Sequence, residues 1–585
     1  MTDIKEITQT IQNELDTDQS ELESLERTEP PATKEDNSKE KDTDKLTTFK
    51  NIRGQLGREL NKIAQEAYDK AYKKALEHPD VALKLKRLAD EVTAWEAGES
   101  KQDPHEELQR QKIETDCRAK AMKAKEKATP KKPLEVADFL KRFIYFVRIQ
   151  PAGHNQKAPL YFYHPDNGVY IENEELLRDC IQTVNPELTE KQASDVLYKI
   201  SHSSNMKEIA SDFTSFGNCL YNAKTEETQD FTPDIIVTRK IKTNYNKQAT
   251  EPNISGWTFK AWLLELFDGD DELYRLAIQV IKASVTGSSL NNLFWLYGEG
   301  GTGKGTLQQL IINIVGLENI ATLKIDELHK SRFVTSQLLG KSVVIGDDVQ
   351  AGAEIKDTSA MFSLTTGDPI TIEEKGKKPY SLTLNMTVIQ SSNGFPNMVG
   401  DVQAIERRFR VLPFTSRFKG KPNKAIKHDY INRKEVLEYV VRLALETQTE
   451  DVNPQASQNA LHDFQLDINP VLAFIADFFT DDLESEFLPN SFVWCVWLYY
   501  LKTNNLTSIK KQNAFHREVG ENLPEGFSKG SKTIPAGDEY HIGFYPSIDQ
   551  PDYVGKLYTT ERHKPEKRRA PKKERGYYHN KKKKE

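Results

Sequence analysis

The chain has 585 residues, which is too long for one hydrophobic core, and a prior of about 150 residues per domain predicts three or four folded units. The formal net charge of −7 is mildly acidic, and the 4 cysteines are too few for a disulfide scaffold and too far apart for a CxxC zinc site. The longest apolar run, FVWCVWLYYL at 492–501, is about half a membrane span, and the N-terminus lacks the basic and apolar regions of a signal peptide. We therefore expect a cytoplasmic protein with no membrane partner.

The N-terminal half is predicted to contain an arm, a spacer and two folded segments. Residues 1–47 are acidic and polar, which indicates a disordered arm. Residues 48–132 are rich in Ala, Lys, Glu and Leu, which favours a helical spacer. Residues 133–255 hold the hairpin pattern PLYFYHPDNGVYI, a second hairpin-like stretch and several helical patterns, and we expect an α+β domain there. Residues 256–290 read as a helical collar or linker, and the acids of FDGDDE within them as a loop and helix N-cap rather than a metal site.

The C-terminal half is predicted to contain a nucleotide-binding domain and a smaller module. Over residues 291–425, strand and helix patterns alternate, and NLFWLYG, KSVVIGDD and LNMTVIQSSN are apolar runs typical of buried parallel strands. Residues 426–550 read as a helical or winged-helix module, with the strand-like stretch 533–545 as its wing. Residues 551–585 are predicted to form a disordered basic tail, which suits a polyanion such as nucleic acid.

The stretch GEGGTGKGT lies between the apolar strand LFWLY and the apolar-periodic helix TLQQLIINIV. This is the layout of a P-loop, in which glycines let backbone N–H groups converge on phosphates and a lysine adds a charge at the β- and γ-phosphates. Lys304 is that lysine, but Gly305 stands where Ser or Thr usually offers a hydroxyl to Mg²⁺. We expect Mg²⁺ to be held here through water, or by Thr306. The predicted ATP-binding residues are Gly298, Glu299, Gly300, Gly301, Thr302, Gly303, Lys304, Gly305 and Thr306.

Polar residues follow two further predicted strands. Asp347 and Asp348 end SVVIGDD, which suits one acid that orients Mg²⁺ and a second that polarises the attacking water. Asn393 ends MTVIQSSN, where an amide would hold the water or contact the γ-phosphate. Some small nucleotide kinases also have the sequence GKGT in this loop, so a nucleotide kinase stays an alternative. An acid pair is of little use to such an enzyme, because a kinase must exclude water.

Two arginines, Arg407 and Arg408, precede the last predicted strand of this domain, in AIERRFRVLPF. If they emerge on the flank opposite to the P-loop, they cannot easily reach the nucleotide of their own chain. They would then act as arginine fingers on a neighbouring subunit, which requires a ring. Surface ion pairing is the alternative for this pair.

Taken in order, GEGGTGKGT, VVIGDD, TTGDPITIEEKGKKP, VIQSSN and RRFRVLPF resemble the motifs of superfamily III helicases, in the branch of phage, plasmid and satellite primase-helicases. The resemblance extends upstream to YFYHPDNGVY and downstream to NPVLAFIADFF and FLPNSFVWCVWLYYLKTNN. It implies a multidomain protein whose central α/β P-loop ATPase is AAA+-like with a parallel sheet, preceded by an α+β/helical domain and followed by a winged-helix-like module, with disordered termini. The first 130 residues show no primase motif or zinc site, so the sequence does not predict priming activity.

The resemblance further implies a homohexamer that translocates on single-stranded DNA with 3′→5′ polarity and unwinds duplex DNA at a replication origin, with host replication proteins as further partners. It favours Arg408 over Arg407 as the finger. An ATP-gated platform that assembles on an origin without unwinding it is the alternative from another class. The predicted DNA contacts are Lys375, Lys377 and Lys378 in a loop that enters the pore, and, on the helix at 508–523, Lys511, Gln512 and Arg517, with His516 on the same outer faces.

Overall fold

The computed structural model divides the chain into two compact units, Met1–Lys45 and Leu46–Glu585, and every element below belongs to the second. Most of the arm predicted from residues 1–47 lies outside the described residues. None of the described helices combines the length and apolar character needed to cross a bilayer. The structure describes residues 45–100, 104–149, 158–328, 333–355, 359–375, 379–398, 407–416, 418, 423–448, 452–481, 483, 486–506, 510–534 and 572–580.

The N-terminal part is helical, in agreement with its composition. It comprises α2 (Ile52–Leu76), α3 (Pro79–Glu96) and α4 (Glu106–Ala128), and α2 packs along α4, where Lys125 Nζ donates to Gln65 Oε1 at 3.1 Å. Few of its side chains are buried, as expected for a spacer. The first turns of α2 are an exception, because Ile52 and Leu56 are buried in the core of the α+β domain that follows.

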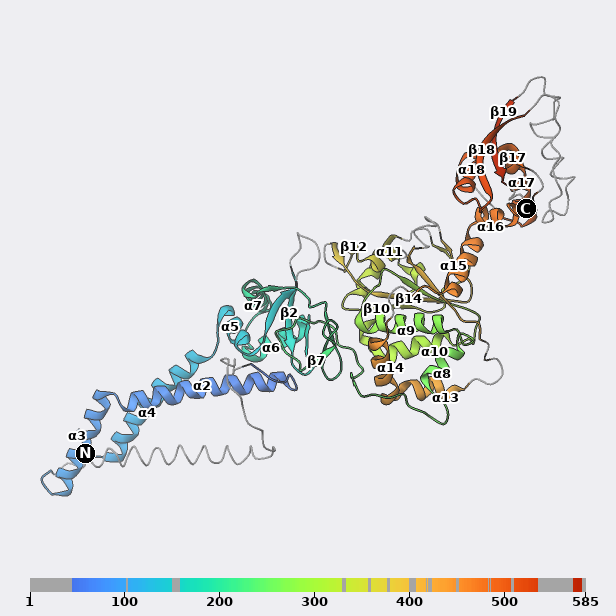
Figure 1. Cartoon of the computed structure of the whole chain (residues 1–585). Coiled ribbons are helices and arrows are strands. Elements are labelled where there is room, and N and C mark those ends of the chain that lie inside the picture. Colours follow the sequence, from blue (N-terminus) through green and yellow to red (C-terminus); the bar gives the residue numbers. More distant parts are fainter. Residues whose placement is uncertain are drawn as a thin grey trace. The chain divides into compact units, whose positions relative to one another are not determined.

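That domain, in which Figure 1 labels β2, is built on a four-stranded sheet of order β3-β2-β1-β4. The predicted hairpin is present as β2 and β3, which pair up to His164 opposite Val169, and Gly168 adopts a φ of 66° in the turn. The second predicted hairpin is present as β6 and β7. The elements are α5 (Pro133–Phe143), β1 (Phe146–Ile149), β2 (Leu160–His164), β3 (Val169–Ile171), α6 (Glu174–Val184), α7 (Glu190–Ser203), β4 (Met206–Lys207), β5 (Phe213–Ser215), β6 (Leu220–Asn222) and β7 (Glu227–Gln229).

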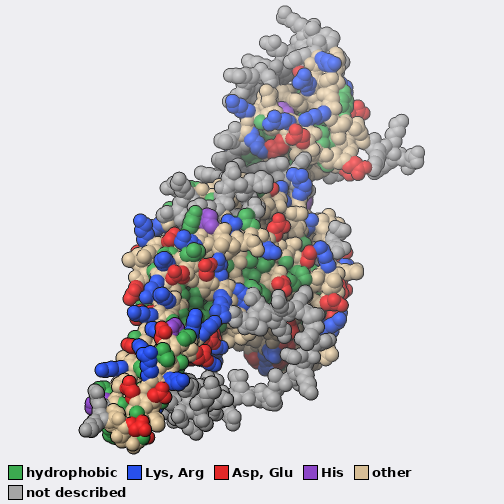
Figure 2. All heavy atoms as spheres, turned by 90° about the vertical axis from the view of Figure 1, so that its left-hand side faces the viewer, with side chains coloured by type: hydrophobic (Ala, Val, Ile, Leu, Met, Phe, Trp, Pro, Cys, Tyr) green, Lys and Arg blue, Asp and Glu red, His purple; other side chains and the backbone are tan. Residues whose placement is uncertain are grey.

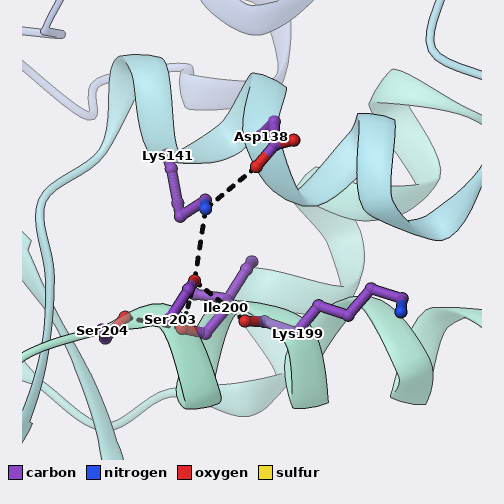
Figure 3. A network of polar contacts seen from close by, with 6 residues as sticks. All are labelled: Asp138, Lys141, Lys199, Ile200, Ser203 and Ser204. Atoms are coloured by element: carbon purple, nitrogen blue, oxygen red, sulfur yellow. Dashed lines mark hydrogen bonds and ion pairs between the residues drawn. The ribbon is translucent and has the colours of Figure 1, made fainter.

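A polar network ties two helices of this domain together (Figure 3). Lys141 on α5 forms an ion pair with Asp138 one turn earlier and donates to the Ser203 hydroxyl at the end of α7, at 3.2 Å. The Ser203 hydroxyl in turn donates to the Lys199 carbonyl, and the Ser204 hydroxyl donates to the carbonyl of Ile200. The network satisfies carbonyl groups in the last turn of α7 while it joins that turn to α5.

The central domain contains a five-stranded sheet whose adjacent strands are all parallel, in the order β16-β8-β14-β10-β9. The three apolar runs singled out in the sequence are β8, β10 and β14, and their side chains are almost entirely buried. A sheet of this kind with helices on both faces is an α/β domain, as predicted. The strands are β8 (Leu293–Tyr297), β9 (Ile320–Thr322), β10 (Val343–Gly346), β14 (Thr387–Ser392) and β16 (Phe409–Pro413).

Helices cover both faces of this sheet (Figure 1). One face packs against α8 (Phe259–Glu265), α9 (Asp271–Thr286), α10 (Lys304–Val315) and α14 (Lys434–Glu446). The other packs against α11 (Ser359–Thr366) and α15 (Gln455–Ile468). Asp270 caps α9 by accepting from two backbone N–H groups, as predicted for FDGDDE.

The limits of the central domain differ from the prediction. The collar predicted at 256–290 contributes α8 and α9 to the core, and α14 and α15, predicted to lie in the C-terminal module, also pack on the sheet. The apolar faces of these four helices are buried against residues of the sheet that are distant in sequence, so the sequence pattern of each helix did not show which domain it joins. The C-terminal module therefore begins near residue 470.

Between β10 and β14 the chain forms an antiparallel hairpin of β12 (Pro369–Ile372) and β13 (Tyr380–Thr383). This hairpin contains the predicted pore loop. Lys375 is exposed near its tip, whereas Lys377 and Lys378 lie outside the described residues. The remaining short elements are β11 (Glu354–Ile355), β15 (Asn397–Met398), α13 (Lys424–His428), and the 3₁₀ turns η1 (Leu317–Asn319), η2 (Ile325–Glu327), η3 (Val334–Leu338) and η4 (Tyr430–Asn432).

The C-terminal module joins three helices to a three-stranded antiparallel sheet of order β17-β19-β18. It has its own apolar core, in which Trp497, Phe515 and Tyr577 are buried. The helices are α16 (Pro470–Phe478), α17 (Asn490–Thr503) and α18 (Gln512–Glu521), and the strands are β17 (Phe487–Pro489), β18 (Phe527–Ile534) and β19 (Lys572–His579).

The tail prediction for residues 551–585 is corrected by β19, which is the central strand of that sheet. The basic composition of this segment suggested a solvated tail. The strand depends instead on pairing with distant segments, in which Tyr577 lies opposite Leu488 on one side and Lys529 on the other. Most of the wing predicted at 533–545 lies outside the described residues, and strand β18 ends at Ile534.

His516 is buried rather than presented outward as expected from its position on the helix. Its Nδ1 lies 2.8 Å from the Tyr577 hydroxyl, and burial, reinforced by the charge of Lys529, lowers the pKa of His516 to about 4. The unfolded chain therefore binds this proton at a higher pH than the folded module, and the module should lose stability as the pH falls from about 6.5 to about 4, by at most about 3 kcal/mol.

Hydrogen exchange of α17 and α18 in the full chain, followed by mass spectrometry from pH 7 to pH 4.5, measures this loss. His516→Leu removes the titrating group, so the protection of these helices should depend less steeply on pH than in the wild type. Equal slopes in the two proteins would contradict the assignment.

Candidate functional site

The glycine-rich loop joins β8 to α10, as the sequence predicted. Gly303 has a φ of 102°, a backbone conformation that favours glycine, and a side chain there would displace the end of the Leu266 side chain. A side chain at Gly298 would meet the Phe414 carbonyl oxygen at 2.5 Å. The loop thus passes between α8 and the end of β16 with no room for larger residues at these two positions.

Lys304 begins α10 and is buried. Its Nζ donates to the carbonyl oxygens of Gly298 and Glu299, the latter at 2.9 Å, and to Asn393 Oδ1 at 3.0 Å. Burial lowers the pKa of Lys304, and the charges of Asp347 and Asp348 partly offset this. The ammonium group is therefore enclosed among neutral oxygens, and an anionic phosphate would stabilise its charge.

The strand order brings the other predicted residues to the same edge. Strand β14 lies between β8 and β10, and all three are parallel, so the residues that follow them meet where the strands end. Asn393 follows β14, and Asp347 and Asp348 follow β10. Together with the loop they enclose a cavity of about 410 Å³, called the P-loop cavity below. Its lining residues are Gly301, Thr302, Gly303, Lys304, Gly305, Thr306, Asp347, Asp348, Ser391, Asn393 and Lys427.

Three predicted ATP-binding residues, Gly298, Glu299 and Gly300, do not line the P-loop cavity. Two of them act through their carbonyl groups on Lys304, and the Thr302 hydroxyl donates to the Glu299 carbonyl at 2.9 Å. Among the lining residues, Asp347 and Thr306 offer the oxygen donors that Mg²⁺ prefers, which fits an ion shared with nucleotide phosphates.

Ser391 is a site residue that the sequence analysis did not single out. Its buried hydroxyl donates to Asp347 Oδ1 at 2.7 Å and accepts from the Asp348 N–H at 3.1 Å. Asp348 has a φ of 55°, an uncommon conformation for a residue other than glycine, which the contacts of Ser391 help to maintain. Ser391 therefore orients both acids. Its place in SSNG, a frequent turn pattern, offered no signal of this role.

If the cavity hydrolyses ATP and Asp347 holds Mg²⁺, removing the Ser391 hydroxyl should raise the Mg²⁺ concentration needed for half-maximal hydrolysis by about 10- to 100-fold, because Asp347 loses the group that orients it. The measurement is an Mg²⁺ titration of ATP hydrolysis by Ser391→Ala. Ser392→Ala is the matched control, since the Ser392 hydroxyl accepts from Trp295 Nε1 and does not line the P-loop cavity. An unchanged Mg²⁺ requirement in Ser391→Ala would exclude this orienting role.

The two arginines are far from this cavity. They precede β16, whose first residue, Phe409, pairs with Leu293, while its last, Pro413, pairs with Tyr297 next to the loop. A five-residue strand separates them from the loop, about 16 Å along the sheet. Arg407 is exposed, and the guanidinium carbon of Arg408 lies 4.8 Å from the centroid of the Phe362 ring.

Lysine and arginine side chains are exposed on the C-terminal module (Figure 2). Lys511, Gln512 and Arg517 are exposed around α18, whereas Phe515 and Val519 are buried on its inner face. The adjacent β18–β19 pair adds exposed basic residues, Lys532, Lys573 and Arg575.

Comparisons with known proteins match three separate segments of the chain. Three families match, described as D5 N terminal like (residues 84–268), a family of unknown function named DUF5906 (residues 296–408) and Poxvirus D5 protein-like (residues 466–547). The second covers the loop and the acids, and the third begins just before α16. The two D5 matches, one before and one after the glycine-rich loop, support a D5-like primase-helicase replication protein of superfamily III.

Among solved structures, the apo C-terminal region of NrS-1 matches at 16% identity and a TM-score of 0.40, over 70% of this chain and 98% of that one. A second apo structure of the same region also has 16% identity and a TM-score of 0.40, over 65% of this chain and 84% of that one. The comparison with curated proteins gave no match.

Proposed function

We propose that this protein is an ATP-driven DNA helicase of a phage, plasmid or satellite element, which acts as a ring at a replication origin and moves 3′→5′ on single-stranded DNA. The observation that carries the proposal is the P-loop cavity, where Lys304, Asn393 and two acids meet at the ends of adjacent parallel strands. An ATPase needs each of these groups, and a nucleotide kinase has no use for the second acid.

Each residue has a distinct role in this proposal. The backbone N–H groups from Gly301 to Thr306 bind the phosphates, and Lys304 holds the γ-phosphate. Asp347 and Thr306 would hold Mg²⁺, which neutralises charge on the phosphates when it is bound. Asp348 polarises the attacking water, and Asn393 positions that water against the γ-phosphate while it remains hydrogen-bonded to Lys304.

The ring is supported by the position of the arginines. Arg407 and Arg408 lie at the opposite end of the sheet from their own P-loop cavity, so they complete a nucleotide site only if a second subunit presents its cavity to them. The closed arrangement that satisfies every such interface is a cyclic oligomer, and we propose a hexamer.

We propose a winged-helix role for the C-terminal module. Its order of helix, strand, two helices and two strands, with a three-stranded sheet, is the expected order for that fold, and α18 would enter the major groove with Lys511, Gln512 and Arg517. Lys375, Lys377 and Lys378 would contact single-stranded DNA from the β12–β13 hairpin. The basic module also favours the second candidate, a platform that binds an origin without unwinding it.

The deciding experiment measures ATP hydrolysis with and without single-stranded DNA, and displacement of a strand from a forked duplex. Lys304→Ala is the negative control. The helicase requires both DNA-stimulated hydrolysis and displacement, each lost in Lys304→Ala. Hydrolysis without displacement would favour the platform, and no DNA-stimulated hydrolysis would overturn the helicase.

A further inference from the structure

Lys427 is the one lining residue of the P-loop cavity that comes from outside the predicted motifs. It lies on α13, more than 120 residues after the loop, and is exposed. Within the described part of the chain, its Nζ forms neither a hydrogen bond nor an ion pair. The cavity therefore contains a second cation besides Lys304, contributed by a segment distant from the loop in sequence.

The position of Lys427 is coupled to the helix that carries the P-loop. Asn313 on α10 donates to the carbonyl of Ile431 at 3.0 Å and to Asn432 Oδ1 at 2.8 Å. The Asn432 amide then donates to the carbonyl of Lys427 itself at 3.1 Å. Side-chain amides from two elements thus hold the backbone of Lys427 in place beside α10.

The missing side chain at Gly305 leaves room for this lysine. A Cβ atom at Gly305 would lie 3.9 Å from Lys427 Nζ, an ordinary van der Waals contact, and apart from the adjoining residues and the backbone of α10 no other described atom is within 4 Å of that point. A serine or threonine at this position would add further atoms beyond Cβ, next to the ammonium group. Gly305 and Lys427 are thus neighbours in the cavity.

We infer that Lys427 binds the α- and β-phosphates of the nucleotide in the P-loop cavity of its own chain. The inference rests on the proposed ATPase function and adds a phosphate ligand to that site. In a P-loop the lysine reaches the β- and γ-phosphates, while the backbone N–H groups of the loop cradle the α- and β-phosphates. Lys427 lies beside Gly305, on the side of those amides, whereas Lys304 Nζ lies with Asn393, so the two cations contact different parts of the chain of phosphates.

Equilibrium binding of fluorescent ATP and ADP to the full chain tests the inference. Lys427→Ala should raise the dissociation constants of both nucleotides by about tenfold, because both carry the α- and β-phosphates and one charge-assisted hydrogen bond is lost. Lys427→Arg should retain most of the affinity. Lys424→Ala is the matched control, since Lys424 is exposed on the same helix but does not line the cavity, and it should bind like the wild type.

The outcomes separate this inference from the proposed function. If the wild type binds ATP, Lys304→Ala weakens that binding and Lys427→Ala does not, the inference fails alone. Weaker binding of ATP with unchanged binding of ADP in Lys427→Ala would overturn the assignment to the shared phosphates. A wild type that binds neither nucleotide would overturn the proposed function and this inference together.

Discussion

Asp348→Asn should lower the rate of ATP hydrolysis by about 10²- to 10⁴-fold and leave the affinity for ATP nearly unchanged. The amide cannot accept a proton from the attacking water, whereas the phosphate ligands of the P-loop are untouched. Asparagine tolerates the left-handed backbone conformation that Asp348 adopts, so the substitution should not disturb the loop. The measurement combines single-turnover hydrolysis with equilibrium ATP binding.

Asp347→Asn is the matched comparison, because its carboxylate accepts from Ser391 and is the proposed Mg²⁺ ligand. Its defect should shrink as the Mg²⁺ concentration rises, while the defect of Asp348→Asn should persist. If the added Mg²⁺ rescued Asp348→Asn instead, the roles of the two acids would have to be exchanged.

The residues of the P-loop cavity were predictable because their signals are local and tied to strand ends. An apolar strand followed by glycines and a lysine places Lys304, and a second apolar strand places Asp347 and Asp348. Because carboxyl ends of parallel strands meet at one edge, the sequence pattern alone implied that these residues would converge. The hairpin around PDNG was predictable for the same reason, since its turn residues and strand pattern are contiguous.

The parts that were missed depend on contacts between distant segments. Lys427 lies in KPNKAIKH, an ordinary basic stretch, and reaches the cavity only because Asn313 and Asn432 hold α13 beside α10. Strand β19 looks like a charged tail until Tyr577 is placed between two partner strands and in their core. The pattern of apolar residues within one segment does not predict contacts with a segment distant in sequence.

The position of Arg408 leads to the prediction with the largest effect. Arg408→Ala should lower ATP hydrolysis by about 10³- to 10⁵-fold in the assembled protein, with ATP binding retained, because an arginine finger neutralises charge that develops only in the transition state. Arg407→Ala is the matched variant, since Arg407 is the exposed neighbour. A larger defect in Arg407→Ala would reassign the finger to that residue, and equal wild-type rates in both would contradict a shared site.

Mixing two inactive variants tests whether the finger acts between subunits. Lys304→Ala lacks a working cavity but keeps its arginine, and Arg408→Ala has the reverse defect. In a ring with one kind of head-to-tail interface, an equal random mixture joins an intact cavity to an intact finger at about a quarter of the interfaces. Hydrolysis should therefore reappear on mixing, up to about that fraction of the wild-type rate if sites act independently. Arg408 acting within its own chain would give no recovery, because neither variant then contains one complete site.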